Sequence, residues 1–159
     1  MSALQTLSAL DAALSARMRV AERPGALRSL AALLAHSGDS WFWFLGLGLL
    51  AAFGSGFWRW WASLLFVAIL GTALLVMTIK FTVRRSRPQG EWGQIYRRTD
   101  PHSFPSGHAA RAALIAALTL GTGPLWAGLF LLLWAALVAL ARVSMGVHYL
   151  SDILAGAAL

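Results

Sequence analysis

Three short segments of the chain carry side chains that suit the binding and transfer of a phosphoryl group. Together they contribute three cations, two histidines, one carboxylate and a Ser-Gly pair. The first segment holds Lys80 and Arg87, the second Ser106, Gly107 and His108, and the third Arg142, His148 and Asp152. The planar guanidinium groups of arginine and the ammonium group of lysine bind phosphoryl oxygens strongly. An apolar chain has strong reasons to exclude such groups, so their presence predicts a functional site.

The third segment supplies a candidate nucleophile. A ring nitrogen of His148 can attack phosphorus and form a phosphohistidine. Asp152 follows His148 by four positions, so on a helix the two side chains share one face. The carboxylate would then fix the imidazole tautomer and stabilise the cation that forms. His108 is the candidate general acid for the leaving alcohol, because histidine titrates near neutral pH.

The other residues predict an anion-binding cradle. Arg87 and Arg142 each offer a planar fork, and Lys80 acts as a point charge. Gly107 lets the backbone approach an anion closely, and with Ser106 it could begin a helix whose positive end meets that anion. These cations would repel a divalent ion and do its work, so we expect no metal and no other cofactor.

The order and spacing of the three segments resemble the type 2 phosphatidic acid phosphatase (PAP2) family of membrane lipid phosphatases. The resemblance covers about residues 60–159. The family usually has serine before the third-segment arginine, where this chain has Ala141. The resemblance implies a metal-independent lipid phosphatase with a phosphohistidine intermediate. It gives catalytic roles to His148, Asp152 and His108 and leaves the cradle to bind substrate.

The composition indicates a membrane protein. Of 159 residues, 58% are hydrophobic and only 12% are charged, and the mean hydropathy is +0.67. A soluble domain carries about 25% charged residues, so we expect most of this surface to face lipid. The net charge of +7 in so apolar a chain favours lipid headgroups and phosphate substrates over nucleic acid. The absence of cysteine excludes disulfides.

Long apolar runs predict membrane-spanning helices. Each run approaches the ~20 residues that a helix needs to cross a bilayer, and glycine-rich or proline-containing turns separate them. We predict spans over 40–58, 60–79, 107–121 and 125–142, then a helix that begins near His148 and runs past Asp152. Only seven residues follow Asp152, so this last span is either short or truncated. The predicted topology brings all three segments to one membrane face.

The predicted fold is therefore a single all-α domain over residues 1–159, a membrane helical bundle of about five spans. Residues 39–159 would form the transmembrane catalytic core. In residues 1–38, leucines recur near helical spacing on both sides of a break at Pro24–Gly25. This pattern is typical of one or two amphipathic helices in the membrane interface. A helix packed on the bundle is an equal alternative.

Basic residues predict the orientation of the protein. Arg59 is the only one of the thirteen expected at the face opposite the three segments. The positive-inside rule then places the catalytic face in the cytoplasm, and we expect a bacterial inner membrane. The sequence does not indicate an oligomeric state.

Several substrates and two other functions fit the same residues. The lipid could be a phosphatidate, phosphatidylglycerol phosphate, a polyprenyl phosphate or diphosphate, or a polyprenyl-linked sugar phosphate. One alternative is a lipid phosphotransferase, in which a hydroxyl replaces water as the acceptor. The other is a non-catalytic membrane scaffold that binds anions.

The remaining charged and titratable residues are expected to have ordinary roles. We predict solvated loop groups at His36, Glu91, Asp100 and His102. Arg84 and Arg85 are expected to meet lipid phosphates. Arg111 lies one helical turn from His108, and we expect it to form a structural ion pair.

Overall fold

The chain forms an all-helical structure, as the sequence predicts. The computed structural model describes residues 3–90, 92 and 94–159, so Glu91 lies outside the described residues. The helices are α1 (Ala3–Arg17), α2 (Ala26–Ser37), α3 (Ser40–Phe53), α4 (Gly56–Val83), α5 (Gln94–Thr99), α6 (Gly107–Thr122), α7 (Leu125–Ser144) and α8 (Leu150–Ala157). The described part of the chain contains no β-strand, only an isolated antiparallel bridge between Ser86 and His102.

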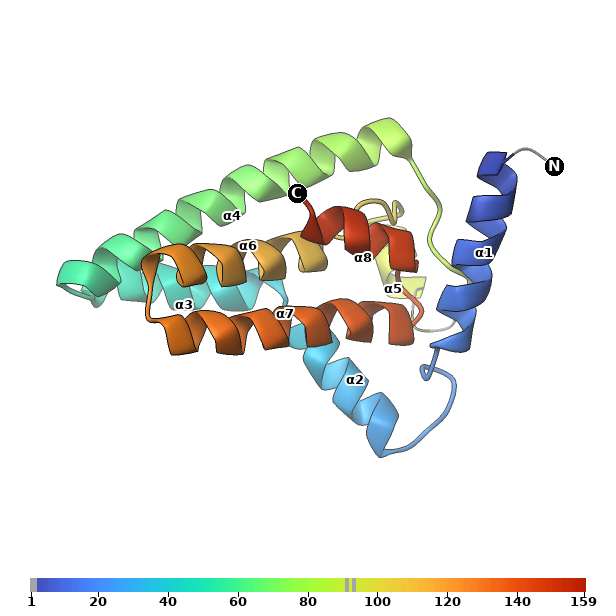
Figure 1. The fold of residues 1–159 in the computed structure, drawn as a ribbon, viewed down its shortest axis with the longest axis horizontal. Coiled ribbons are helices and arrows are strands. Elements are labelled where there is room, and N and C mark those ends of the chain that lie inside the picture. Colours follow the sequence, from blue (N-terminus) through green and yellow to red (C-terminus); the bar gives the residue numbers. More distant parts are fainter. Residues whose placement is uncertain (1–2, 91, 93) are drawn as a thin grey trace.

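The body of the molecule is a bundle of α3, α4, α6 and α7, with α4 inclined across the others (Figure 1). The turns α3–α4 and α6–α7 lie together at one end of this bundle. Both turns fall where glycine and proline interrupt the apolar sequence. Gly56 has a φ of 51°, a backbone conformation that favours glycine, and Pro124 immediately precedes α7. The residues of the three segments predicted to bind and transfer phosphate therefore lie at the opposite end of the bundle.

Small residues bring α6 and α7 close together. A buried cluster joins Ala112 and Ala116 of α6 to Ala135 and Val138 of α7. At Gly128 of α7 an added Cβ would lie 2.8 Å from the α6 backbone. Close backbone approach through small residues is typical of helices that pack within a membrane. It fixes the α6–α7 hairpin that carries His108 and Arg142.

Among the described helices two, α4 with 28 residues and α7 with 20, are long and apolar enough to cross a membrane. The helix α3 is apolar but has only 14 residues, because it ends at Phe53 rather than near residue 58. Large apolar side chains on these helices are exposed, among them Leu74 on α4 and Phe130 on α7. The membrane character is supported, whereas the predicted count of about five spans is not confirmed.

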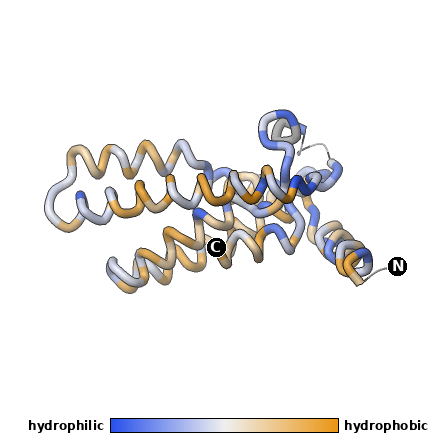
Figure 2. The backbone as a smooth tube through the Cα atoms, turned by 90° about the horizontal axis from the view of Figure 1, so that it is seen from above, coloured by the Kyte–Doolittle hydropathy of each residue, from blue (hydrophilic) through white to orange (hydrophobic). Residues whose placement is uncertain are grey.

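The N-terminal segment forms two helices that separate near Pro24–Gly25. Ala31 and Ala35 of α2 pack against the C-terminal end of α7, whereas α1 lies across the end of the bundle beside α8 and exposes most of its leucines. Hydrophilic residues gather at this end, and hydrophobic residues predominate along the bundle (Figure 2). The N-terminal segment thus covers the polar end of the molecule.

Candidate active site

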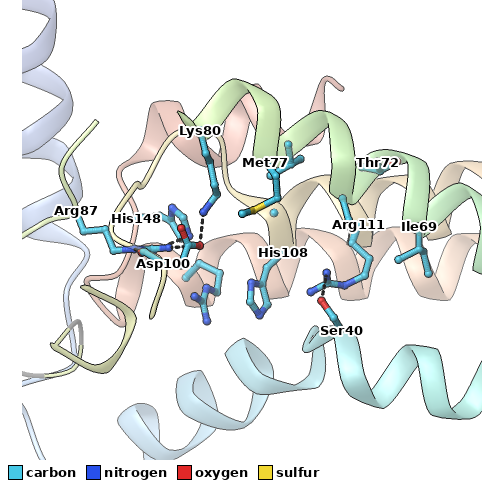
Figure 3. Close-up of a pocket in the computed structure, with 14 residues that line it drawn as sticks. Ser40, Ile69, Thr72, Met77, Lys80, Arg87, Asp100, His108, Arg111 and His148 are labelled. Atoms are coloured by element: carbon cyan, nitrogen blue, oxygen red, sulfur yellow. Dashed lines mark hydrogen bonds and ion pairs between the residues drawn. The ribbon is translucent and has the colours of Figure 1, made fainter. Parts of the chain in front are cut away.

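A pocket of about 170 Å³ opens where the end of α4 meets the start of α6 (Figure 3). Its charged and titratable lining residues are Lys80, Arg87, Asp100, His108, Arg111, Arg142 and His148. Its apolar wall comes from α4, namely Ile69, Ala73, Val76 and Met77. The pocket therefore joins a group of cations and histidines to an apolar surface of a membrane-length helix.

Arg87 lies against the candidate nucleophile. Its Nη1 donates to the carbonyl of Val147 at 2.9 Å and lies 3.1 Å from Nε2 of His148. A guanidinium can only donate, so Nε2 is the unprotonated acceptor in this contact. The ring proton then belongs on Nδ1, and the lone pair of Nε2 faces the side where Arg87 lies.

Asp152 lies beside the other ring nitrogen of His148. Its Oδ2 is 3.5 Å from Nδ1, and both side chains are almost completely buried. A carboxylate at this distance favours a proton on Nδ1. The sequence placed both residues on one helical face, but α8 begins at Leu150 and His148 lies in the preceding loop. The pair is thus formed across the start of the helix rather than along it.

The surroundings of His148 keep its ring neutral. Burial lowers the pKa of His148 well below its ordinary value, and the positive charges of Arg142, Arg87 and Lys80 lower it further. Arg142 itself is 1% exposed and lines the same pocket. A neutral imidazole retains the lone pair that nucleophilic attack requires.

Asp100 connects two cations of the pocket. Its Oδ2 accepts hydrogen bonds from Nη2 of Arg87 at 2.8 Å and from Nζ of Lys80. Its backbone carbonyl accepts another from Nε of Arg87 at 2.7 Å. The prediction that Asp100 is a solvated loop group is therefore wrong, because the loop before α6 folds back over the end of α4. The carboxylate lies beside the cations predicted to bind phosphate.

Arg85 also has a different environment from the one predicted. Its Nη1 donates to Oδ1 of Asp152 at 2.8 Å, and its Nη2 donates to Oδ2 of Asp11 at 2.7 Å. The guanidinium also lies over the Tyr149 ring, 4.0 Å from its centroid. These contacts direct Arg85 inward to the carboxylate behind His148, rather than outward to lipid phosphates.

His108 lies beside a carboxylate that the sequence analysis did not single out. Its Nε2 lies 2.8 Å from Oδ1 of Asp39, in the turn between α2 and α3. Burial raises the pKa of Asp39, but hydrogen bonds from His108 and His36 outweigh it and hold this pKa at about 2. Among the described residues Arg111 binds the Gly38 carbonyl in this turn and Ser40 Oγ at the start of α3, rather than forming the expected ion pair.

Residues 60–159, more than half of the chain, match the model of the PAP2 superfamily. The chain belongs to the PAP2 superfamily. Membership makes it a phosphate-ester hydrolase of membrane lipid metabolism. The matched region contains every residue singled out from the three segments.

Two solved structures are similar to this PAP2 protein over most of its length. One is a transmembrane PAP2-type phosphatidylglycerolphosphate phosphatase from Bacillus subtilis, with a TM-score of 0.75 and 24% identity over 96% of this chain and 79% of that chain. The other is LpxE of Aquifex aeolicus, with a TM-score of 0.74 and 26% identity over 94% of this chain and 88% of that chain. Both support the helical PAP2 fold.

The Ser-Gly pair of the PAP2 segment occupies the start of α6. Ser106 is fully buried and caps the helix, because its Oγ accepts from the backbone N–H of Ala109 at 3.4 Å. Its own N–H donates to the carbonyl of Asp152 at 2.9 Å. Gly107 lines the pocket, whereas Ser106 lies behind it. In this arrangement Ser106 joins α6 to α8, and of the pair only Gly107 lines the pocket.

Proposed function

We propose that this PAP2 protein hydrolyses a phosphate monoester or diphosphate of a membrane lipid, with His148 as nucleophile. The supporting observation is the pocket, in which Lys80, Arg87 and Arg142 adjoin an apolar wall on α4. A phosphate among the cations would leave its lipid chain beside Val76 and Met77. Candidate substrates are phosphatidate, phosphatidylglycerol phosphate, a polyprenyl phosphate or diphosphate, and a polyprenyl-linked sugar phosphate.

The proposed reaction has two steps. In the first, the lone pair of His148 Nε2 forms a bond to phosphorus while the bond from phosphorus to the lipid oxygen breaks. His108 gives a proton to that oxygen, and Asp152 stabilises the charge on the His148 ring. In the second, His108 takes a proton from water as its oxygen attacks phosphorus. The P–N bond breaks, inorganic phosphate leaves, and both histidines return to their starting states.

We propose that no metal takes part. Phosphoryl transfer depends mainly on positioning and on stabilising the charge of the non-bridging oxygens. Arg87, Arg142 and Lys80 can supply that stabilisation, with Gly107 at the positive end of α6 and Ser106 as the cap that holds this helix start in place. The same cations would repel a divalent ion from the site.

The proposed setting is a bacterial inner membrane with the pocket at the cytoplasmic face. Residues 39–159 would form the transmembrane core of a single domain of about five spans, with residues 1–38 on its surface. The clustering of basic residues near the pocket supports this orientation, since Arg59 lies in the first turn of α4 at the other end of the bundle, where it donates to the Gly54 carbonyl.

Phosphate release by detergent-purified protein tests the proposal. Wild type and His148→Ala would be compared in excess chelator against the candidate lipids. We expect release that survives chelation, is lost in the variant and passes through an acid-labile phosphohistidine that radiolabelled substrate can trap. Release that requires a metal, or an unchanged His148→Ala, would contradict the mechanism. Phosphate transfer only to an added alcohol would identify a lipid phosphotransferase instead.

A further inference from the structure

The turn between α2 and α3 covers one side of His108. Asp39 lies in this turn and places one carboxylate oxygen 2.8 Å from Nε2 of His108. Its other oxygen lies 3.1 Å from Nδ1 of His36. His108 and His36 thus lie on either side of one carboxylate, and of the two only His108 lines the pocket.

Several buried or partly buried contacts hold this turn in place. Arg111 of α6 donates from Nε to the Gly38 carbonyl at 3.0 Å and from Nη1 to Ser40 Oγ at 2.6 Å. At the end of α2, the Ser37 hydroxyl accepts from Nε1 of Trp134 at 2.9 Å. The position of Asp39 is therefore fixed from α6 and α7, which also carry His108 and Arg142.

Gly38 permits this close approach. A Cβ at this position would lie 3.0 Å from the side chain of Val138 and 3.3 Å from Cδ2 of His108. Both distances are tighter than ordinary side-chain contacts, so a larger residue would push the turn away from the ring. The glycine thus allows the backbone next to Asp39 to lie close to the His108 ring.

The charges around His108 make a carboxylate important. Burial is the largest factor that disfavours a positive charge on the ring, and Arg142 from α7 and Arg111 from α6 disfavour it further. His148 also lies near enough to interact with the ring. Asp39 is the group that opposes them, and His36 adds a second hydrogen bond to its carboxylate. A hydrogen-bonded carboxylate favours the imidazolium form.

We propose that Asp39 is the positioning residue that holds His108 as a general acid, by accepting the Nε2 hydrogen and stabilising the imidazolium. This inference rests on the proposed function. With Nε2 committed to Asp39, the proton that moves is the one on Nδ1. It passes to the lipid oxygen as the P–O bond breaks, and Nδ1 recovers a proton when water attacks the phosphohistidine. Asp39 keeps its negative charge throughout.

The leaving group provides a direct test. A lipid alkoxide needs a proton as it departs, whereas p-nitrophenolate is a stable anion and departs without one. We expect Asp39→Asn, which keeps the shape and removes the charge, to lower kcat on short-chain phosphatidate at least tenfold, within the range of proton-transfer catalysis. On p-nitrophenyl phosphate the loss should stay below about threefold, with KM unchanged for both. His36→Ala removes only the contact of Asp39 outside the pocket, so any loss of kcat in this comparison variant should be small and equal on both substrates.

The pH profile and the His108→Ala variant complete this kinetic test. In Asp39→Asn the alkaline limb of kcat/KM should move to lower pH, because a weaker partner releases the ring proton earlier. His108→Ala should show the same dependence on leaving group. Equal losses of Asp39→Asn on both substrates, or a raised KM with unchanged kcat, would overturn the proposal and assign Asp39 a structural or binding role.

Nitrogen-15 NMR of the histidine rings tests the pairing without turnover. The chain has only four histidines, so His108 can be assigned by substitution. The Nε2–H signal of His108 should shift in Asp39→Asn and shift much less in His36→Ala, which keeps the carboxylate. An unshifted signal in an enzyme that hydrolyses lipid phosphate would overturn this inference and leave the proposed function standing. If the signal shifts in Asp39→Asn but the wild-type protein releases no phosphate, the proposed function is overturned and the acid role with it.

Discussion

Arg85 donates to the buried carboxylate of Asp152, with 2.8 Å between Nη1 and Oδ1. The other end of the same guanidinium binds Asp11 of α1 at 2.7 Å. Asp152 also accepts the N–H of Tyr149 at 2.8 Å, which caps the start of α8. The N-terminal helix is therefore connected through one arginine to the carboxylate that faces His148.

Removal of the Arg85 charge should impair catalysis more than binding. In Arg85→Gln the Asp152 carboxylate loses its charged partner while it stays fully buried. Loss of one member of a buried pair costs about 3 kcal/mol, and less here because Arg85 is partly exposed. We expect a lower Tm and at least a tenfold loss of kcat, because a carboxylate that shifts by ~1 Å no longer orients the nucleophile.

The neighbouring arginine offers a matched control for this prediction. Arg84 is exposed, and its Nε donates only to the nearby carbonyl of Phe81. Arg84→Gln should leave kcat and Tm close to wild type in thermal-shift and phosphate-release assays. Equal behaviour of the two variants would mean that net charge near the membrane, rather than the contact with Asp152, explains the effect.

The contribution of α1 can be isolated with Asp11. Its carboxylate accepts from Arg85, from the Ser151 backbone at 3.1 Å and from the Ser151 hydroxyl. Asp11→Asn should lower kcat a fewfold, since Arg85 keeps Asp152 as a partner. In a double-mutant cycle with Arg85→Gln, the second substitution should add little, because contacting residues do not act additively. Fully additive losses in kcat would contradict the proposed connection.

The sequence predicted the fold where the signal is local. Uncharged runs and the breaks at Gly54–Gly56, Pro24–Gly25 and Pro124 correspond to the helices and turns found. Span number was harder, because glycine ends α3 at Phe53 and α6 has only 16 residues. Helix length in a membrane bundle depends on packing and tilt that periodicity does not encode.

The same limit applies to the site. Residue type and offset were enough to select the six residues that meet in the pocket. They were not enough to find Asp39, Arg85 and Asp100 as partners, because the contacts that matter join residues 13 to 74 positions apart. The chain has only six acidic residues, so each carboxylate was a candidate partner for the buried cations. This scarcity of acidic residues was the one sequence feature that pointed to Asp39 and Asp100.

Asp100 should compete with a bound phosphate. Its carboxylate already accepts from Lys80 and from Arg87, so an incoming anion must share or displace it. Asp100→Asn removes a negative charge from the pocket and should tighten product inhibition by inorganic phosphate roughly five- to tenfold, a fraction of the Coulomb energy available at such distances. The measurement is the inhibition constant in steady-state assays. Weaker inhibition would show instead that Asp100 is needed to hold the two cations in place.

The folded state should lose stability as the pH falls below about 6.5, the ordinary histidine pKa. His148 has a lowered pKa in the folded state, so the unfolded chain binds a proton there while the folded chain does not. Stability from this group is therefore present above about pH 6.5 and declines below it. The pKa of Asp39, at about 2, confines its own contribution to more acidic conditions. Thermal-shift measurements between pH 7.5 and 5 should show a slope that His148→Gln reduces, and an unchanged slope would contradict this assignment.

Labelling of single cysteines would test the proposed orientation without interference, since the chain has no cysteine of its own. Gln94, at the start of α5 on the pocket side, and Ser55, in the α3–α4 turn, are both exposed and lie at opposite ends of the bundle. If the basic residues near the pocket face the cytoplasm, an impermeant maleimide should label Ser55→Cys in intact spheroplasts and Gln94→Cys only after lysis. Both variants should retain phosphate release, because neither residue lines the pocket. The reverse pattern of labelling would place the active site on the outer face and restrict the substrates to lipids that reach that leaflet.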